Sequence, residues 1–229
     1  KYDGTNAPSM VANINPGSGS GYPNYLTVFN YELYFIAYDV TYGNELWNYD
    51  GTNAPSMVGG MNTQSGCGNP YLTVFNNELY FIAEVGSGCE LWNYDGTNAP
   101  SMVADINPGG SSSPGYLTVF NNELYFRANG GTYGYELWKY NVTTNAPSMV
   151  ANIYPGTSGS SPHDLTVFNN ELYFRANYPP NGYELWKYDG TNFPSMVADI
   201  NPGSSSSSPN SLTVFNNELY FSANDGTNG

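Results

Sequence analysis

Basic residues are scarce in this 229-residue sequence, which holds five Lys and Arg against 19 Asp and Glu, for a net charge of −14. A surface of this sign repels nucleic-acid backbones and anionic membranes. There is a single histidine, His163, in the loop-like stretch SSPHD. Catalytic triads and zinc sites therefore have little material to draw on. The sequence predicts a protein that is not an enzyme, binds no nucleic acid and does not insert into a membrane.

Long apolar runs are also absent, and none reaches the length of a membrane helix. The sequence shows no initiator Met and no secretion signal, so we expect a processed product or a fragment of a longer repeat protein. Core-forming material is plentiful, with 40% apolar and 16% aromatic residues. The acidic composition, rich in Asn, Ser and Tyr, suits a protein that stays soluble outside a cell. We therefore expect it to be secreted or held at a cell surface.

One phrase recurs along the chain: LTVFN begins at Leu26, Leu72, Leu117, Leu165 and Leu212. The spacings of 46, 45, 48 and 47 residues define five copies of one repeat. Each copy contains four strand-like segments, which read LTVF, ELYF, ELWNYD or ELWKYD, and SMVADI or a close variant. Asn-Asn between the first two segments fits a two-residue hairpin turn, because Asn tolerates a positive φ. The stretch DGTNAP fits a turn before the fourth segment.

Apolar side chains fall on both faces of these strands. Pairing across the hairpin of the second copy places Leu79 and Phe81 on one face, and Phe75 and Tyr80 on the other. Such sheets must be covered on both sides. Radial stacking of four-stranded sheets achieves this and leaves only short edges. We therefore predict an all-β, five-bladed β-propeller with four antiparallel strands per blade, formed by residues 1–229 as a single domain.

The two ends of the sequence each hold part of a repeat. The C-terminal LTVFNNELYFSANDGTNG supplies the first two strands of a blade, and the N-terminal KYDGTNAPSMVANI supplies the end of a third strand and a fourth. We expect one blade to be shared by both chain ends. The residues YELW are missing between Gly229 and Lys1. Either one strand is shortened, or the sequence is cut from a longer chain.

The two cysteines, Cys67 and Cys89, both belong to the second copy. They precede its first and third strands, which run in the same direction and therefore begin at the same end of the sheet. We expect a disulfide between them, worth about 3 kcal/mol in the chain-entropy model. Such a bond implies an oxidising compartment. Two free thiols in loops are the alternative.

The combination GYELWKYDGTN, MVADINPGSSSSSP and LTVFNNELYFSANDGTNG resembles the ELW/DGT repeat family, hyalin-like secreted bacterial surface repeats. The resemblance covers all five copies. It implies an extracellular, non-catalytic context and brings no ligand or catalytic residues with it. The third copy departs from the pattern, because NVTTN replaces DGTN. This change creates a sequon at Asn141, a candidate glycosylation site.

Carboxylates recur at fixed positions. The third strands open with Glu45, Glu90, Glu136 and Glu184, and the DGT turns contain Asp50, Asp95 and Asp189. The three aspartates are weak candidates for a Ca²⁺ site, because no copy has the dense alternating Asp pattern of a calcium loop. The competing interpretation is that each Asp holds its turn by hydrogen bonds to nearby backbone N–H groups. No other cofactor is expected.

The loops between second and third strands differ most between copies and combine amides with tyrosines. This mixture suits a sugar, which offers hydroxyls at its edge and C–H groups on its face. The candidate ligand-binding residues are Asn44, Asn129, Tyr133, Tyr135, Asn177, Tyr183 and Asn224. We interpret the four tryptophans, Trp47, Trp92, Trp138 and Trp186, as core between blades. Arg127 changes together with Lys139, and Arg175 with Lys187, which predicts cross-strand neighbours on an exposed surface.

Two functions are compatible with these features of the sequence. The first is a non-catalytic, multivalent carbohydrate-binding module, lectin-like or adhesive. The alternative is a structural unit of a surface filament or extracellular matrix with no small-molecule ligand. The expected partners are accordingly glycans or other copies of the chain itself.

Overall fold

The structure is a computed structural model that describes residues 1–60, 67, 71–86 and 88–228. The regular elements among these residues are all β-strands. The described residues contain no helix that is long and apolar enough to cross a membrane. They separate into two compact units, Lys1–Met102 and Val103–Gly229, and we describe each unit by itself. The expectation of a single domain over residues 1–229 stays a prediction.

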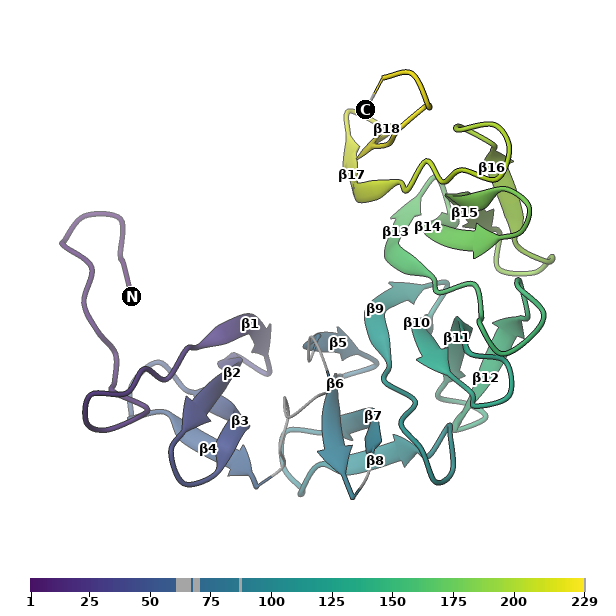
Figure 1. Cartoon of the computed structure of the whole chain (residues 1–229). Coiled ribbons are helices and arrows are strands. Elements are labelled where there is room, and N and C mark those ends of the chain that lie inside the picture. The colour runs from purple at the N-terminus through teal and green to yellow at the C-terminus, as the bar shows by residue number, and fades with distance from the viewer. Residues whose placement is uncertain (61–66, 68–70, 87, 229) are drawn as a thin grey trace. The chain divides into compact units, whose positions relative to one another are not determined.

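The strands form five antiparallel sheets in chain order (Figure 1). The first sheet contains β1 (Asn24–Phe29), β2 (Glu32–Asp39), β3 (Gly43–Tyr49) and β4 (Ser56–Gly59), and the second contains β5 (Thr73–Phe75), β6 (Glu78–Val85), β7 (Gly88–Tyr94) and β8 (Ser101–Ala104). The third contains β9 (Gly115–Phe120), β10 (Glu123–Asn129), β11 (Tyr135–Asn141) and β12 (Ala146–Ala151). The fourth contains β13 (His163–Phe168), β14 (Glu171–Tyr178), β15 (Gly182–Tyr188) and β16 (Ser195–Ala198), and the fifth contains β17 (Asn210–Phe215) and β18 (Glu218–Ser222). Four antiparallel strands per repeat, predicted from the sequence, are confirmed for the first four repeats, and the fifth sheet has two strands.

The hairpin between the first two strands of each sheet is set by a pair of residues with positive φ. In the second sheet Asn76 and Asn77 have φ of 47° and 59°, and Phe75 faces Glu78 across the turn. The later Asn-Asn pairs have nearly the same angles. Asparagine adopts this conformation more easily than other non-glycine residues, which confirms the predicted hairpin.

The N-terminal segment contains no strand among its first 23 residues, yet its local structure matches part of a sheet. The Ser9 backbone N donates to the Lys1 carbonyl at 3.0 Å, and the Lys1 amino terminus donates to the Ser9 carbonyl at 2.6 Å. Asn48 and Ser56 pair at the corresponding positions of β3 and β4. Lys1–Ser9 therefore has the form of the turn between a third and a fourth strand, and β17–β18 has the form of the first two strands of a sheet.

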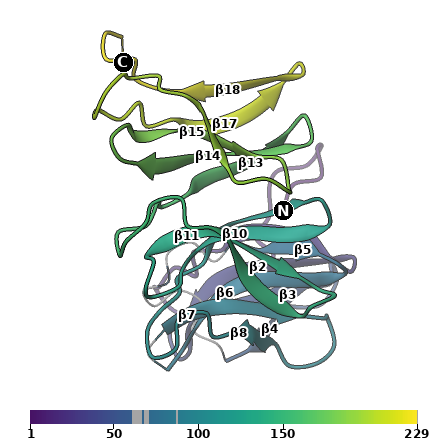
Figure 2. The same cartoon turned by 90° about the vertical axis from the view of Figure 1, so that its right-hand side faces the viewer.

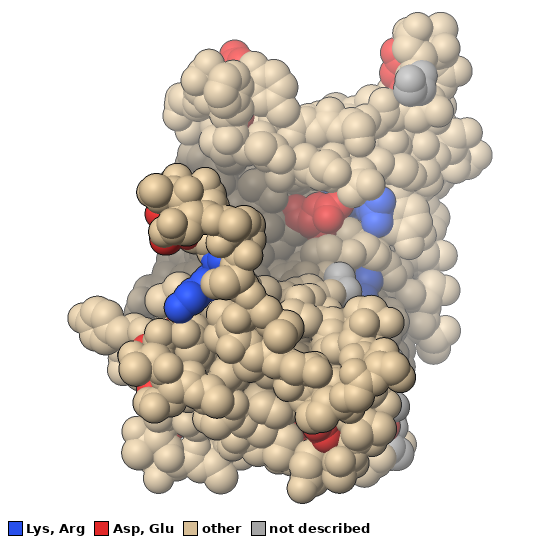
Figure 3. Space-filling model, turned by 90° about the vertical axis from the view of Figure 1, so that its left-hand side faces the viewer, with Lys and Arg blue, Asp and Glu red and all other residues tan. Residues whose placement is uncertain are grey.

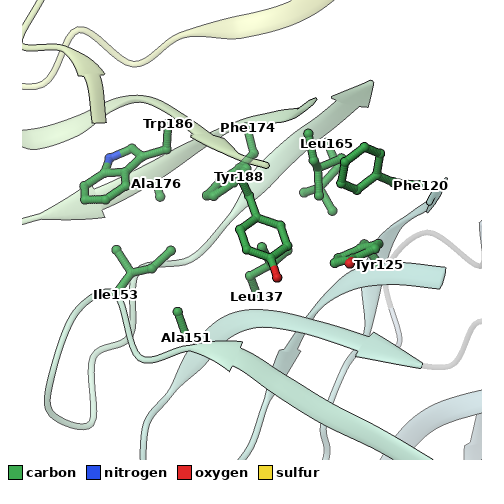
Figure 4. Close-up of a cluster of buried hydrophobic side chains, with 11 residues drawn as sticks. Phe120, Tyr125, Leu137, Ala151, Ile153, Leu165, Phe174, Ala176, Trp186 and Tyr188 are labelled. Atoms are coloured by element: carbon green, nitrogen blue, oxygen red, sulfur yellow. The ribbon is translucent and has the colours of Figure 1, made fainter. Parts of the chain in front are cut away.

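The core of the second unit lies between the third and fourth sheets, which stack face to face (Figures 2 and 4). The third sheet and the loop that follows it contribute Phe120, Tyr125, Leu137, Ala151 and Ile153, and the fourth contributes Leu165, Leu172, Phe174, Ala176, Trp186 and Tyr188. Trp186 is 6% exposed, as expected for a tryptophan between blades. In the first unit Phe29 and Tyr34 pack against Leu79 and Phe81 in the same way. Burying each such side chain stabilises the fold by about 1.5–3 kcal/mol.

The threonine of LTVF links successive sheets through the backbone. Thr118 Oγ1 donates to the Leu165 carbonyl at 3.3 Å, and Thr166 Oγ1 donates to the Leu212 carbonyl at 3.4 Å. In the second unit β13 accordingly lies between β9 and β17 (Figure 1). Thr27 makes the same bond to Leu72 in the first unit. These bonds explain why a β-branched hydroxyl recurs at this place in the repeat.

Candidate functional site

An amide faces a tyrosine where the second strand of a sheet ends and the third begins. Asn129 pairs with Tyr135 in the third sheet, and Asn177 with Tyr183 in the fourth. In the first sheet the order is reversed, because Tyr38 faces Asn44. The structure thus brings most of the candidate ligand-binding residues into cross-strand pairs. The reversed partner in the first sheet was not predicted.

The two remaining ligand candidates lie in loops at the same end of their sheets. Tyr133 is 43% exposed between β10 and β11. Asn224 is exposed after β18, and its Oδ1 accepts a hydrogen bond from the Gly226 backbone N at 2.7 Å. Asn129 Oδ1 accepts from the Gly131 N at 2.8 Å in the same manner. The carbonyl oxygens of these two amides therefore hold their own loops.

A cationic cluster adjoins the amide–tyrosine pairs of the second unit. The Arg127 guanidinium lies 4.8 Å from the Tyr135 ring centroid and 5.3 Å from that of Tyr116. Its Nη1 lies 2.8 Å from His163 Nε2, while His163 Nδ1 lies 2.6 Å from the Ser161 carbonyl. Because a carbonyl only accepts, Nδ1 carries the proton and Nε2 accepts from Arg127. The histidine is held as a neutral acceptor.

Two expectations about these residues need correction. His163 does not lie in a loop: it is the first residue of β13, where it pairs with Arg175. Arg127 does not face Lys139 across the strands, because Arg127 pairs with Leu137, and Lys139 pairs with Tyr125. Alignment of the repeats identified the corresponding positions correctly, but it did not give the register of the second strand against the third.

Burial is the main cause that lowers the pKa of His163, and the hydrogen bond to the Ser161 carbonyl opposes it; the charges of Arg127 and Arg175 lower the pKa further, and that of Asp164 raises it. We expect NMR titration to place this pKa below the ordinary value of about 6.5. The unfolded chain then binds the proton at higher pH than the folded chain, so the free energy of unfolding falls as the pH drops below about 6.5.

His163→Asn tests this pH dependence with a residue that occurs at the corresponding position in two other repeats, Asn24 and Asn210. The variant should lose the part of the acid destabilisation that the histidine causes. A titration midpoint of His163 at or above its ordinary pKa would contradict the described contacts.

The aspartates of the DGT turns are occupied by their own turns. Asp189 Oδ1 accepts from the backbone N of Thr191 and of Asn192 at 2.8 Å, and Asp189 Oδ2 accepts from Asn192 Nδ2 at 2.6 Å. These bonds, with the Asn192 side chain first, lower the pKa of Asp189 to about 2. Asp50 and Asp95 make the same set of bonds. Over the described ranges, no three His, Cys, Asp or Glu side chains gather as a metal site would require.

The glutamate of the ELW motif is buried and accepts hydrogen bonds from the loop that follows the fourth strand. Glu136 is fully buried, and its carboxylate accepts from the backbone N of Ile153, Tyr154 and Ser160 at 3.2, 3.1 and 3.0 Å, and from Ser160 Oγ at 2.5 Å. Burial raises its pKa, although these donors oppose the shift. Glu184 likewise accepts from Ser207 N and Oγ. The motif therefore ties the loop after the fourth strand to the third strand.

Asn141, the candidate glycosylation residue, is half-buried at the end of β11. Its Nδ2 donates to Glu123 Oε1 at 2.8 Å, and its Oδ1 accepts from the Thr143 N at 2.8 Å. A glycan would have to be attached at this same nitrogen, so the Glu123 bond would have to change. Whether the residue is modified stays a prediction.

The predicted disulfide is confirmed. Cys67 and Cys89 are bonded, with their Cα atoms 5.3 Å apart, and both are 5% exposed against Ile82. Glu84 faces Cys89 across β6 and β7, at the place where the other complete sheets hold an amide opposite a tyrosine. The second sheet has a covalent bond where the others have a candidate ligand pair.

Comparisons with known proteins match the fold alone. Neither a protein-family model nor a curated protein matches the sequence. Among solved structures, the chain is similar to prolyl endopeptidases (TM-score 0.57, 9% identity, 92% of this chain and 35% of that chain). It is also similar to a puromycin-hydrolyzing peptidase of Mycobacterium tuberculosis (TM-score 0.53, 13% identity, 78% of this chain and 29% of that chain).

The chain thus spans about a third of the length of the peptidases that it matches. The shared part is their β-propeller. At such low identity the likeness carries no activity across. Together with the repeated four-stranded sheets, it establishes that the chain has a β-propeller fold.

Proposed function

We propose that the protein is an extracellular, non-catalytic, multivalent carbohydrate-binding module. The observation that carries the proposal is the amide–tyrosine pair, present at the same end of the first, third and fourth sheets. An amide can bond sugar hydroxyls while a tyrosine ring covers the C–H face. Repetition on one scaffold lets weak sites add up through avidity.

Two further features support an extracellular setting. The Cys67–Cys89 bond favours an oxidising compartment. The resemblance to ELW/DGT repeats implies secreted or surface-attached proteins, and we carry that implication here as part of the proposal.

Calorimetric titration with a panel of neutral and acidic oligosaccharides tests the function. We expect the unmodified protein to bind its sugar with low affinity. Tyr135→Ala and Tyr183→Ala should each lower this affinity about five-fold or more, whereas Tyr135→Phe keeps the ring and should keep most of the affinity. Tyr31→Ala is the matched control, because Tyr31 is fully exposed in the hairpin at the opposite end of its sheet. Absence of binding to every sugar would refute the proposal.

A structural unit that associates with copies of itself is the second candidate. It is supported by exposed apolar side chains on the first and fifth sheets, including Val28 at 69% and Phe215 at 61%. Sedimentation velocity over a wide concentration range distinguishes the two functions. Assembly into long species, without any sugar ligand, would favour the structural unit.

A further inference from the structure

We infer from the geometry of the second unit that Arg127 and Arg175 form a binding site for the carboxylate of an acidic sugar. The inference rests on the proposed function and deepens it by naming the class of ligand. It concerns the third and fourth sheets, because the corresponding residues of the first two sheets are Ile36 and Ile82.

Neither arginine has a carboxylate partner in the part of the chain that the structure describes. The two ion pairs found there use Lys139 with Glu123 and Lys187 with Glu171. The chain has 19 acidic residues and only five basic ones, so carboxylates are available in surplus. Basic side chains are sparse on the face drawn in Figure 3. Two guanidinium groups left without an anion are therefore available for one from outside.

Aromatic rings hold both arginines in place. Arg127 lies over the rings of Tyr116 and Tyr135, and Arg175 lies 5.5 Å from the Tyr183 ring centroid. A guanidinium held in this way loses little conformational entropy when it binds. Arginine has five N–H donors, and Arg127 gives one to His163. The Nε atoms of both arginines are buried, whereas their Nη groups have no described hydrogen-bond partner beyond His163, so Nη donors remain for a planar carboxylate.

The two charges flank the same histidine. Arg127 donates to His163, and Arg175 is its cross-strand partner. Because His163 accepts rather than carries charge, it positions Arg127 without competing for an anion. Asp164, the next residue, is the nearby opposing charge that the histidine senses. Two guanidinium groups outweigh this one carboxylate.

The amides place the rest of the ligand. Asn129 is two residues from Arg127 along β10, and Asn177 is two residues from Arg175 along β14, so each amide shares a strand face with its arginine. Gly115 is the cross-strand partner of Arg127 in the third sheet, and a glycine has no side chain that could cover the Arg127 guanidinium. A carboxylate at the arginines therefore sets a sugar ring beside the amide–tyrosine pairs.

The test uses tetragalacturonate and its fully methyl-esterified form, which differ in charge while keeping the same sugar. We expect the unmodified protein to bind tetragalacturonate about ten-fold or more tightly than the ester. The variant Arg127→Ile with Arg175→Ile should lose this preference, and isoleucine fits these positions as it does in the first two sheets. The variant Lys139→Asn with Lys187→Asn introduces the residue that the first two sheets have there, Asn48 and Asn93. It removes the same charge and should keep the preference.

Equal affinity for the acid and the ester, or a preference that survives in the double arginine variant, would overturn the inference while leaving the proposed function intact. Competition by acetate or by a polyglutamate peptide that matches tetragalacturonate would also overturn it, because the site would then read carboxylates without a sugar. Failure of every oligosaccharide to bind would instead refute the proposed function. Circular dichroism and thermal melting confirm that each variant is folded.

Discussion

Replacing Glu136 by alanine is expected to lower the free energy of unfolding by about 3–5 kcal/mol. The side chain is 0% exposed, and its removal leaves the backbone N–H groups of Ile153, Tyr154 and Ser160 without their acceptor. An unpaired buried donor costs about 1–3 kcal/mol, and the cavity adds to that cost. Gly159 shows how closely this loop approaches the third strand, because any Cβ there would clash with the Tyr135 backbone. The loop is thus packed closely onto β11.

Urea unfolding measures this loss directly. The free energy of unfolding of Glu136→Gln should lie between that of the alanine variant and that of the unmodified protein. The amide oxygen of glutamine can still accept a hydrogen bond, but its amide nitrogen cannot accept one and would face N–H donors. Glu218→Ala is the control, because Glu218 is exposed and its one hydrogen bond in the described structure comes from Tyr220. A Glu136→Ala variant as stable as Glu218→Ala would show that the hydrogen bonds of Glu136 contribute nothing to the free energy of unfolding.

Replacing both Cys67 and Cys89 by serine is expected to lower the free energy of unfolding by about 3 kcal/mol. The bond closes a loop with a sequence separation of 22 residues, and opening that loop raises the entropy of the unfolded chain. The two side chains are also buried against Ile82, so the serine hydroxyls would need new partners.

The unmodified protein under reducing conditions supplies the matched comparison, because reduction opens the loop without changing the residues. We expect its urea midpoint to move most of the way toward that of the double serine variant. If neither reduction nor substitution changes the stability by more than about 0.5 kcal/mol, the loop-closure account of this bond is wrong.

The fold followed from the sequence where local rules decide it. Asn-Asn pairs specify four of the hairpins, since few other residues accept two successive positive φ values, and Asn30 with Tyr31 forms the hairpin of the first sheet. The strand order then placed Cys67 and Cys89 at one end of a sheet, and the bond followed from that order. The same four strand-like segments recur in each copy of the repeat, so the same sheet was predicted for each copy.

The cationic cluster did not follow from the sequence, because its members come from different repeats. Arg127 meets His163 of the next sheet, and no spacing within one repeat predicts that contact. The partners of Glu136 were missed for a related reason, since Ser160 lies 24 residues away in an irregular loop. One signal was present: Ser112, Ser160 and Ser207 recur at matching positions and are all buried. A small polar residue that recurs in this way between copies points to a buried acceptor.

The turn aspartates show the opposite case, in which a repeated carboxylate needs no ligand to explain it. Asp50, Asp95 and Asp189 each bind two backbone N–H groups and one Asn amide of their own turn. Their repetition reflects the repetition of the turn. The proposed carboxylate site rests instead on Arg127 and Arg175, which occur in only two copies.

The central claim is that each repeat folds as one antiparallel blade of a β-propeller, and zero-length carbodiimide cross-linking of the monomer tests the strand order within a blade most directly. Lys139 on β11 contacts Glu123 on β10 at 3.1 Å, and Lys187 on β15 contacts Glu171 on β14 at 2.9 Å. The account predicts a cross-link within each of these two pairs, found by mass spectrometry of the monomer. Absence of both cross-links, or their presence in cross-linked dimers alone, would contradict sheets formed by consecutive strands of one chain.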